Sequence, residues 1–344
     1  MYRNARELDL ELVPEKMPHR DADIEMVAKA FRPIADGREA SPVRIFGPSG
    51  AGKTTIAQFT IRRLQRNGVA VRYGLADCMS DSSPAALLHR LCDELGPTTE
   101  FRRGSTPAPA YLDRLRDMDS PVVAILDEVH HVDDTGVLKQ LHDLPDVSLI
   151  VIGHDEEELG KRTSEKTASR LRTGPKVRLD KYTHDEMVDI LETRVKAAVH
   201  PRYVDANALD LIADTTAGNA REAIAILRKA VRHVQYNDPE RVTPEVVAEI
   251  EKDARMELLR YNLSRLDREH RILFEVLLEA DEELDGSTLH DRFEDEIGSS
   301  TAPKTRRRYL NDLQNYKLVE KHGSGRGATY SPSDLVAEPP TPSF

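Results

Sequence analysis

The chain has 344 residues, with 60 Asp and Glu against 49 Lys and Arg, and a formal net charge of −11. With 39% hydrophobic residues it is too apolar for a disordered acidic protein, and its length suits about two or three folded domains. Two cysteines exclude a disulfide framework, and no apolar run approaches the roughly 20 residues that cross a bilayer. We therefore expect a cytoplasmic protein without a membrane partner. Its acid excess indicates a salt-adapted host.

The first 180 residues alternate strand-like and helix-like segments, the pattern of a parallel sheet covered by helices. Ser83 followed by Pro84 predicts the start of one of these helices. The expected strands cover residues 43–46, 69–78, 121–128 and 146–153, and the expected helices include 54–68, 84–96 and 111–118. We therefore predict an α/β core over 41–179, with residues 1–40 as an N-terminal segment that packs on it.

Helices replace strands after about residue 180. Thr183 and Glu186 form the pattern of a capping box, and further helices are expected over 205–216, 219–237 and 244–266. These segments predict a small helical lid over 180–258. The lid then leads into a domain of different composition.

The stretch 259–334 predicts a winged helix, since three helices are followed by a β-hairpin. The expected elements are helix 267–280, a helix capped by Ser287, helix 303–316, and strands 317–321 and 328–330 around the glycine-rich turn 323–327. The tail 335–344 is expected to be disordered.

A phosphate-binding loop joins the first strand to the first helix of the core. The residues that match G-x-x-x-x-G-K-[ST] are Gly47, Pro48, Ser49, Gly50, Ala51, Gly52, Lys53 and Thr54, with Thr55 next on the helix. The glycines let backbone N–H groups turn toward phosphates at the helix N-terminus. Lys53 is expected at the β and γ phosphates, and Thr54 at Mg²⁺. The cofactors expected are therefore ATP or ADP with Mg²⁺.

Two carboxylates stand at the C-terminal end of the apolar strand 121–128. In a parallel sheet Asp127 and Glu128 would lie beside the phosphate-binding loop. Without that loop, the two acids would indicate only an ordinary solvated strand end. With the loop present, we expect Asp127 to hold Mg²⁺ and Glu128 to activate the attacking water. The sequence thus predicts an ATPase.

With these motifs, the chain resembles the archaeal replication-initiator branch of the AAA+ ATPases, the origin-recognition-complex and cell-division-cycle-six type. The resemblance extends over most of the chain, through the stretches 13–28, 125–132, 169–191, 218–230 and 306–320. It implies an AAA+ core, a helical lid and a winged helix. The implied function is a nucleoid-associated initiator that binds origin repeats in duplex DNA, hydrolyses ATP slowly and helps to load an MCM-like replicative helicase.

The resemblance also implies roles for four residues. Arg221 would be the lid arginine that reaches the γ-phosphate. If copies associate on DNA, Arg170 would be the arginine finger that acts on a neighbouring subunit's nucleotide, and Arg172 is the competing candidate. An ordinary surface ion pair is the alternative for each arginine. His154 stands where the family usually has Asn, which leaves the hydrolysis rate open.

A basic island marks the expected DNA-binding domain. Residues 301–330 carry seven basic and two acidic residues, a net charge of +5, directly after a strongly acidic stretch at 281–296. The candidate contacts are Lys304, Arg306, Arg307, Arg308 and Arg326, with Arg102 and Arg103 as a second site in the core. Successive helical residues lie about 100° apart, so we expect one or two of the three adjacent arginines to reach DNA.

Other functions are left open by the residues alone. A non-replicative AAA+ regulator that binds DNA, and an assembly adaptor whose winged helix binds proteins, are the alternatives to the initiator. His130 with His131, and His89 with Cys92 and Cys78, lack the paired ligand spacing of a zinc site, so no metal besides Mg²⁺ is expected.

Overall fold

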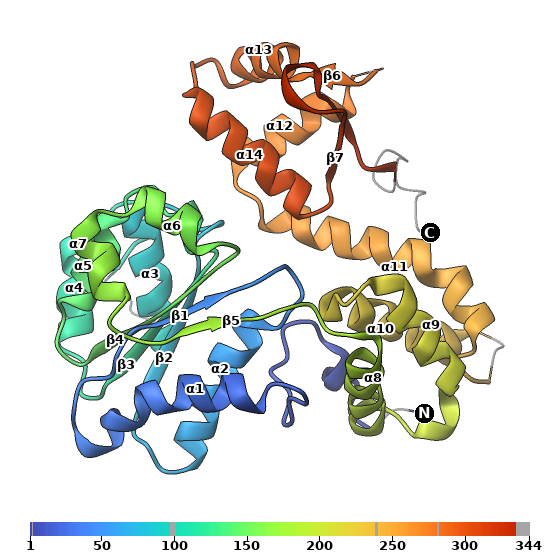
Figure 1. Ribbon diagram of the computed structural model, residues 1–344, viewed down its shortest axis with the longest axis horizontal. Helices are drawn as coiled ribbons and strands as arrows, with labels where there is room; N and C mark the ends of the chain where they lie inside the picture. The colour runs from blue at the N-terminus through green and yellow to red at the C-terminus, as the bar shows by residue number, and fades with distance from the viewer. Residues whose placement is uncertain (2, 97–100, 238–239, 281, 335–344) are drawn as a thin grey trace.

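The computed structural model describes residues 1, 3–96, 101–237, 240–280 and 282–334. Its largest element is a five-stranded parallel sheet whose strands lie in the order β2, β3, β4, β1, β5 (Figure 1). The strands are β1 Val43–Phe46, β2 Arg72–Asp77, β3 Val122–Asp127, β4 Val147–Gly153 and β5 Lys176–Arg178. Because all strands run in one direction, the loops that follow β1, β3 and β4 meet at the same edge of the sheet.

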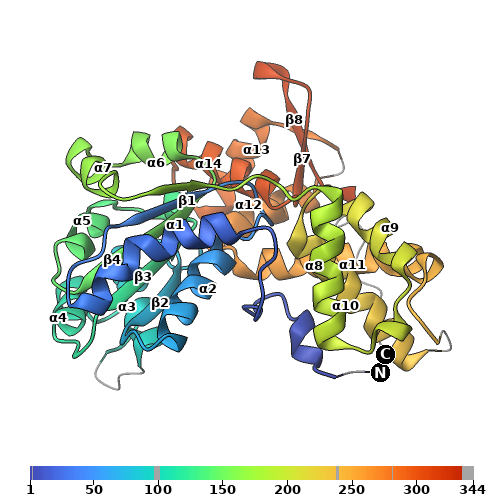
Figure 2. The same cartoon turned by 60° about the horizontal axis from the view of Figure 1, so that its bottom comes forward.

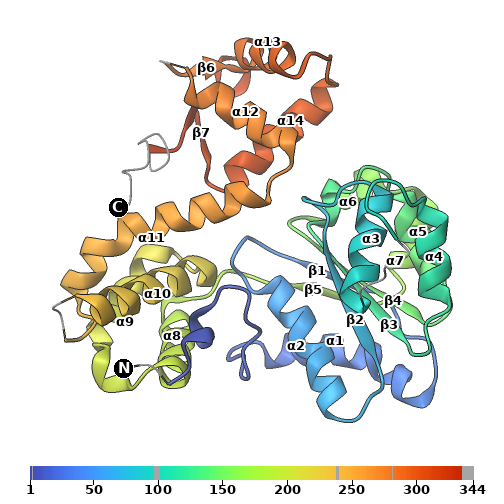
Figure 3. The ribbon, with the colours of Figure 1, turned by 180° about the vertical axis from the view of Figure 1, so that it is seen from behind.

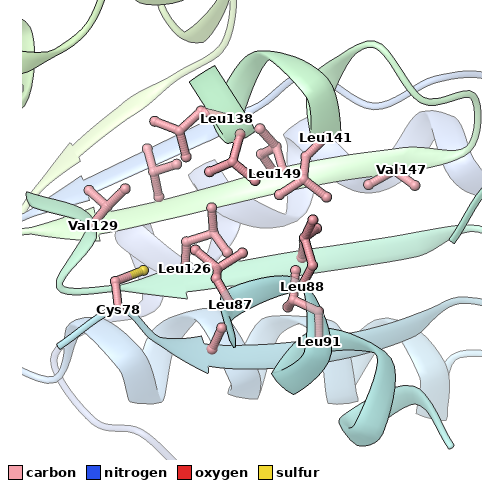
Figure 4. Packing of buried hydrophobic residues seen from close by; sticks show 14 of the residues in the cluster. Cys78, Leu87, Leu88, Leu91, Leu126, Val129, Leu138, Leu141, Val147 and Leu149 are labelled. Carbon is pink, nitrogen blue, oxygen red and sulfur yellow. The ribbon is translucent and has the colours of Figure 1, made fainter. Parts of the chain in front are cut away.

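Helices cover both faces of this sheet, because alternate side chains of a strand point to opposite sides. Leu126 of β3 packs with α3 and α5, whereas Val123 and Ile125 of the same strand pack with α1 and α2. Figure 4 shows the first of these cores, with leucines of α3 and α5 against β3 and β4. The helices of this core are α1 Asp21–Phe31, α2 Lys53–Arg66, α3 Pro84–Leu95, α4 Ala108–Arg116, α5 Gly136–His142, α6 Glu156–Arg162 and α7 Glu165–Leu171.

The helical lid forms a separate apolar core after β5. It consists of α8 His184–Ala198, α9 Ala206–Thr216, α10 Ala220–Tyr236 and the first part of α11 Pro244–Arg265. The predicted capping box starts α8: the Thr183 hydroxyl accepts from the Glu186 N–H, and the Glu186 carboxylate accepts from the Thr183 N–H. The helix therefore begins where the sequence pattern places it.

The N-terminal segment divides between two cores. Phe31 of α1 packs under the parallel sheet, but Leu8 is buried among the lid helices. The backbone N–H groups of Arg3 and Asn4 both donate to the carbonyl of Ala198, at the end of α8. Figure 2 shows the N-terminal segment beside α8. We expected all of residues 1–40 to pack on the α/β core, and this is corrected for the residues around Leu8. They pack on the lid, because Leu8 is buried among the apolar side chains of the lid helices.

Helix α11 runs from the lid into the C-terminal domain (Figure 3). That domain contains α12 Arg268–Leu278, α13 Gly286–Ile297, α14 Pro303–Asn315, and strands β6 Leu284–Asp285, β7 Val319–His322 and β8 Thr329–Pro332. The expected hairpin gains a third strand, because Leu284 pairs with Tyr330 in an antiparallel sheet of order β6, β8, β7. Asp285 rather than Ser287 caps α13, since its carboxylate accepts from the N–H groups of Ser287 and Thr288.

Short 3₁₀ helices complete the fold. They are η1 Ala5–Leu8, η2 Arg32–Asp36, η3 Val129–His131, η4 Pro201–Tyr203 and η5 Gly325–Gly327. Within the described ranges, no helix combines the length and the apolar composition needed to span a bilayer. The predicted tail 335–344 lies outside the described residues.

Candidate nucleotide site and nucleic-acid surface

The phosphate-binding loop lies between β1 and α2, where two other segments come very close to its glycines. A Cβ on Gly47 would lie 2.4 Å from the carbonyl oxygen of Leu179, and one on Gly50 would lie 1.9 Å from Asn219 Oδ1. Gly50 also has a φ of +75°, which side-chain-bearing residues rarely adopt. Glycine is therefore required here by packing as well as by the turn.

Lys53, Thr54 and Asp127 meet at the carboxyl edge of the sheet. Lys53 is buried, and its Nζ donates to the carbonyls of Gly47 at 2.9 Å and Pro48 at 3.0 Å. Thr54 Oγ1 donates to Asp127 Oδ2 at 2.6 Å. Burial raises the pKa of Asp127, and the charges of neighbouring carboxylates add to this rise. A hydroxyl and a carboxylate oxygen in contact are ligands that Mg²⁺ accepts.

Glu128 lies against His154, which follows β4. The backbone of Glu128 has φ 51° and ψ 44°, a left-handed conformation that costs a non-glycine residue about 1–2 kcal/mol. His154 Nε2 is 3.4 Å from Glu128 Oε2. Burial alone would raise the pKa of Glu128, but the contact with His154 holds that pKa well below its usual range. For His154, burial alone would lower the pKa, but the contact with Glu128 outweighs burial and raises it. The contact thus favours the protonated form of His154 and the ionised form of Glu128.

The lid contacts the phosphate-binding loop directly. Asn219 caps α10, and the next N–H, that of Ala220, donates to the carbonyl of Gly50 at 3.2 Å. Gly218 has φ +78°, and a Cβ there would lie 2.3 Å from the Tyr182 carbonyl. The guanidinium of Arg221 lies over the ring of Tyr261 in α11, 5.3 Å from its centroid. The start of α10 therefore lies at the loop, while the Arg221 side chain packs on α11.

Arg20 is a site residue that the sequence reasoning missed. It is buried, stacks 4.1 Å from the ring centroid of Tyr182, and donates to the carbonyls of Ala51 and Asp180. It thereby ties the N-terminal segment to the phosphate-binding loop and to the strand that leads into the lid. No motif spacing distinguishes it, because its partners are backbone carbonyls that are distant in sequence.

Both candidate finger arginines belong to the α7 region on the surface of the core. Arg170 forms an ion pair with Asp143 of the α5 terminus. Arg172 lies 3.2 Å from Glu165 and lines a cavity of about 560 Å³ together with Pro48 and His154. The structure therefore brings Arg172 to a cavity at this chain's own loop, and holds Arg170 in a surface ion pair.

The three adjacent arginines of α14 have different surroundings. Arg306 donates to Glu294 of α13 at 2.9 Å, and Arg308 lies 5.4 Å from the ring centroid of Tyr309. Arg307 is exposed. For Lys304 and Arg326, the side chains lie outside the described part of the structure.

The second expected DNA site lies in the loop before α4. Arg103 forms a 2.7 Å ion pair with Asp81, while Arg102 is exposed and its N–H donates to Thr106. Residues 97–100 of this loop lie outside the described residues. Both arginines are exposed, and Arg103 is the one that forms an ion pair.

The C-terminal domain contacts both the core and the lid. Arg265 at the end of α11 lies 2.7 Å from Asp77 of β2, and Lys317 Nζ lies 2.8 Å from Glu222 of α10. Asp312 of α14 is buried beside His130 and His131, two and three residues after Glu128. The nucleotide site, the lid and the C-terminal domain thus touch one another.

Two parts of the chain match known families. Residues 37–159 match the family described as AAA domain, and residues 188–252 match the Cdc6 AAA+ ATPase-type lid domain. Together with the parallel sheet, the phosphate-binding loop and the Asp127–Glu128 pair, these matches define an AAA+ P-loop ATPase. Nucleotide and Mg²⁺ use follow from that class.

The chain belongs to the ORC1-type DNA replication proteins, the ORC1/Cdc6 replication-initiator family. It is 35% identical to ORC1-type DNA replication protein 9 of Halobacterium salinarum, over 98% of this chain and 95% of that protein. ORC1-type DNA replication protein 1 of the same organism is 32% identical over 90% of this chain and 100% of its own length. The acid excess of the sequence fits these haloarchaeal relatives.

Solved structures share the fold. The Aeropyrum pernix ORC1 protein in complex with DNA has a TM-score of 0.73 at 23% identity, covering 98% of this chain and 95% of that one. The ORC2 protein of the same organism, in ADPNP and ADP complexes, has a TM-score of 0.67 at 19% identity, covering 98% and 97%. These similarities extend over the C-terminal domain as well as the ATPase core.

Proposed function

We propose that this protein is an ATP-switched initiator that binds duplex DNA at replication origins and helps to load an MCM-like replicative helicase. One observation supports this most strongly: the nucleotide site contacts both the lid and the C-terminal domain. The Ala220 N–H of the lid bonds to Gly50 of the phosphate-binding loop, and Asp312 of the C-terminal domain lies beside the residues after Glu128. A change at the phosphates would therefore alter how the C-terminal domain is held.

The residues at the loop fit MgATP. Bound MgATP supplies the phosphoanhydride bond that is broken and the negative charge that the site must neutralise. Lys53 brings a buried cation to the loop, and the adjacent oxygens of Thr54 and Asp127 would hold Mg²⁺. The glycines keep the loop free of side chains where phosphates would lie.

Hydrolysis in this site would be slow. Glu128 would orient the attacking water and accept its proton, but its ion pair with His154 makes the carboxylate a weak base. Arg221 would have to leave the ring of Tyr261 to reach the γ-phosphate, which links lid closure to turnover. Copies that associate on DNA would bring Arg170 or Arg172 of α7 to a neighbour's nucleotide.

The C-terminal domain would bind DNA as a winged helix, with α14 in the major groove and the β7–β8 hairpin along the backbone. Arg307 is exposed on that helix and is the contact we favour, with Lys304 and Arg326 as further candidates and Arg102 as a contact from the core. A structure of the Aeropyrum pernix ORC1 protein contains DNA, which supports a similar role here. We place the working protein on the nucleoid in the cytoplasm.

A genome-wide map of the sites bound in the native host tests this function. We expect enrichment at repeated, AT-rich inverted sequences beside origins, together with loss of helicase recruitment when the protein is depleted. Enrichment at promoters without any effect on replication would support a transcriptional regulator instead. Crosslinking to proteins without DNA enrichment would support an assembly adaptor. Either result would contradict the proposal.

A further inference from the structure

Three metal-ligating side chains from two domains meet in a buried cluster. His131 comes from η3 of the ATPase core, whereas His270 comes from α12 and Asp312 from α14 of the C-terminal domain. We call these three residues the interdomain cluster. Their nearest ligand atoms all lie within 4.8 Å of one another, and each residue is 3% exposed or less.

The cluster is centred on one carboxylate. Asp312 Oδ2 lies 3.0 Å from His270 Nε2 and 3.4 Å from His131 Nδ1. Two imidazole nitrogens and one carboxylate oxygen converging on a point form a donor set that Zn²⁺ takes in proteins. Mg²⁺ prefers oxygen ligands and retains water, so this set does not suit it.

The ring of His270 is already held in the orientation of a metal ligand. Its Nδ1 lies 2.6 Å from Asp267 Oδ1, and Asp267 also caps α12 by accepting from the His270 N–H at 2.9 Å. A carboxylate on the far ring nitrogen fixes the tautomer that leaves Nε2 free to bind a metal. This outer carboxylate is the usual companion of a zinc-bound histidine.

A fourth buried histidine, His130, lies beside the cluster. The ring of His130 lies 4.1 Å from that of His131, and its Nε2 is 3.9 Å from Asp312 Oδ1. Its Nδ1 forms no hydrogen bond within the described structure and lies 3.5 Å from Glu128 Oε2. The Nε2 of His130 is therefore the atom that would complete the coordination of the three ligands.

The charges around the cluster favour a dication. Asp312 and Asp267 bring two carboxyl groups to the cluster, and Arg308 is an arginine whose charge acts on both Asp312 and His131. Neither carboxylate has a lysine or arginine ion pair among those described. A bound Zn²⁺ would balance the buried acids.

We propose that His131, His270 and Asp312 bind one Zn²⁺, which fastens the C-terminal domain to the ATPase core beside Glu128. Because the ligands come from both units, the ion binds tightly only when the domains are docked. It therefore stabilises the docked arrangement by mass action. An overlapping set, Glu128 with His130 and His131, would also hold a metal, but Glu128 is already paired with His154.

Zinc content of the full chain tests the proposal. Chelator-treated protein is incubated with Zn²⁺ in excess Mg²⁺, dialysed, and measured by atomic mass spectrometry, with tetrahedral Co²⁺ absorption as a second readout. We expect one zinc per chain, loss of it in His270→Ala and Asp312→Asn, and about 10- to 100-fold weaker binding in Asp267→Asn. His184→Ala is the matched control, because His184 also lies beside carboxylates but is exposed.

Folding and domain docking are followed in the same samples. Circular dichroism shows whether each variant is folded. If His270→Ala and Asp312→Asn unfold, Asp267→Asn still tests the proposal, because it keeps all three ligands. Small-angle scattering should show that zinc compacts the wild type and leaves His270→Ala unchanged. A wild type that binds no zinc, or zinc retained in folded His270→Ala and lost in Glu128→Gln, would overturn the proposal. Neither result would bear on the DNA-binding function.

Discussion

At the scale of single residues, the structure pairs Glu128 with His154 at the end of the sheet. The ion pair keeps Glu128 ionised in a buried place, and the left-handed backbone aims its side chain at the end of β4. Motif position and family resemblance predicted that Glu128 and His154 belong to the site. Their contact was not predicted, because the order of the strands in the sheet decides which loops meet.

Glu128→Gln should keep nucleotide affinity and lose turnover. The amide preserves shape but cannot accept the proton of water, so the hydrolysis rate should fall by about 10²- to 10⁴-fold. Single-turnover hydrolysis and a fluorescent-nucleotide titration measure the two quantities. Glu157→Gln, an exposed residue near the same sheet edge, is the control. Unchanged turnover in Glu128→Gln would remove Glu128 from the mechanism.

Arg307→Ala should weaken DNA binding more than Arg306→Ala does. Arg307 is exposed, whereas Arg306 is committed to Glu294. Loss of one phosphate contact reduces the slope of log affinity against log salt by about 0.9. Anisotropy of a labelled origin duplex across several salt concentrations measures this slope. Equal effects of the two substitutions would place the DNA contact elsewhere.

At the scale of elements, local signals predicted where most helices start. The Ser83 cap and the Thr183 capping box are both present. The strand β5 and the third strand β6 were not predicted, because each is two or three residues long and is defined by its pairing partner. The Ser287 cap was wrong, since the helix starts two residues earlier, where the Asp285 carboxylate accepts from the N–H groups of Ser287 and Thr288.

Thr183→Ala should destabilise the lid by about 1 kcal/mol, the usual value of an N-cap side chain. The substitution removes the acceptor for the Glu186 N–H at the start of α8. Denaturant unfolding followed by circular dichroism gives the free energy. Thr215→Ala is the control, because that hydroxyl donates only to the Ile212 carbonyl within its own helix. A loss no larger than the control's would show that the cap carries no stability.

At the scale of the whole molecule, the structure joins features that the sequence left separate. The sequence shows an acidic chain with a basic stretch at 301–330, but it does not show that the two parts are in contact. Lys317, which contributes to the island's charge, bonds to Glu222 of the lid. Interdomain contacts of this kind connect residues about a hundred positions apart and leave no local pattern to read.

Arg265→Ala should loosen the C-terminal domain. Arg265 donates twice to Asp77 Oδ2, at 3.2 and 2.7 Å, and charged hydrogen bonds contribute about 1.5–3 kcal/mol. Small-angle scattering should show a larger radius of gyration for the variant. Arg260→Ala, an exposed position on the same helix, should leave it unchanged. An unaltered radius in Arg265→Ala would mean that other contacts suffice to dock the domain.

We predict that nucleotide at the phosphate-binding loop controls DNA binding by the C-terminal domain. The most direct measurement is the dissociation constant for a labelled origin duplex with ATP, with ADP and without nucleotide, in the wild type and in Lys53→Ala. We predict at least about a fivefold difference between ATP and ADP in the wild type. Lys53→Ala should bind DNA equally in all three conditions. Identical wild-type constants with ATP and ADP would contradict the claim.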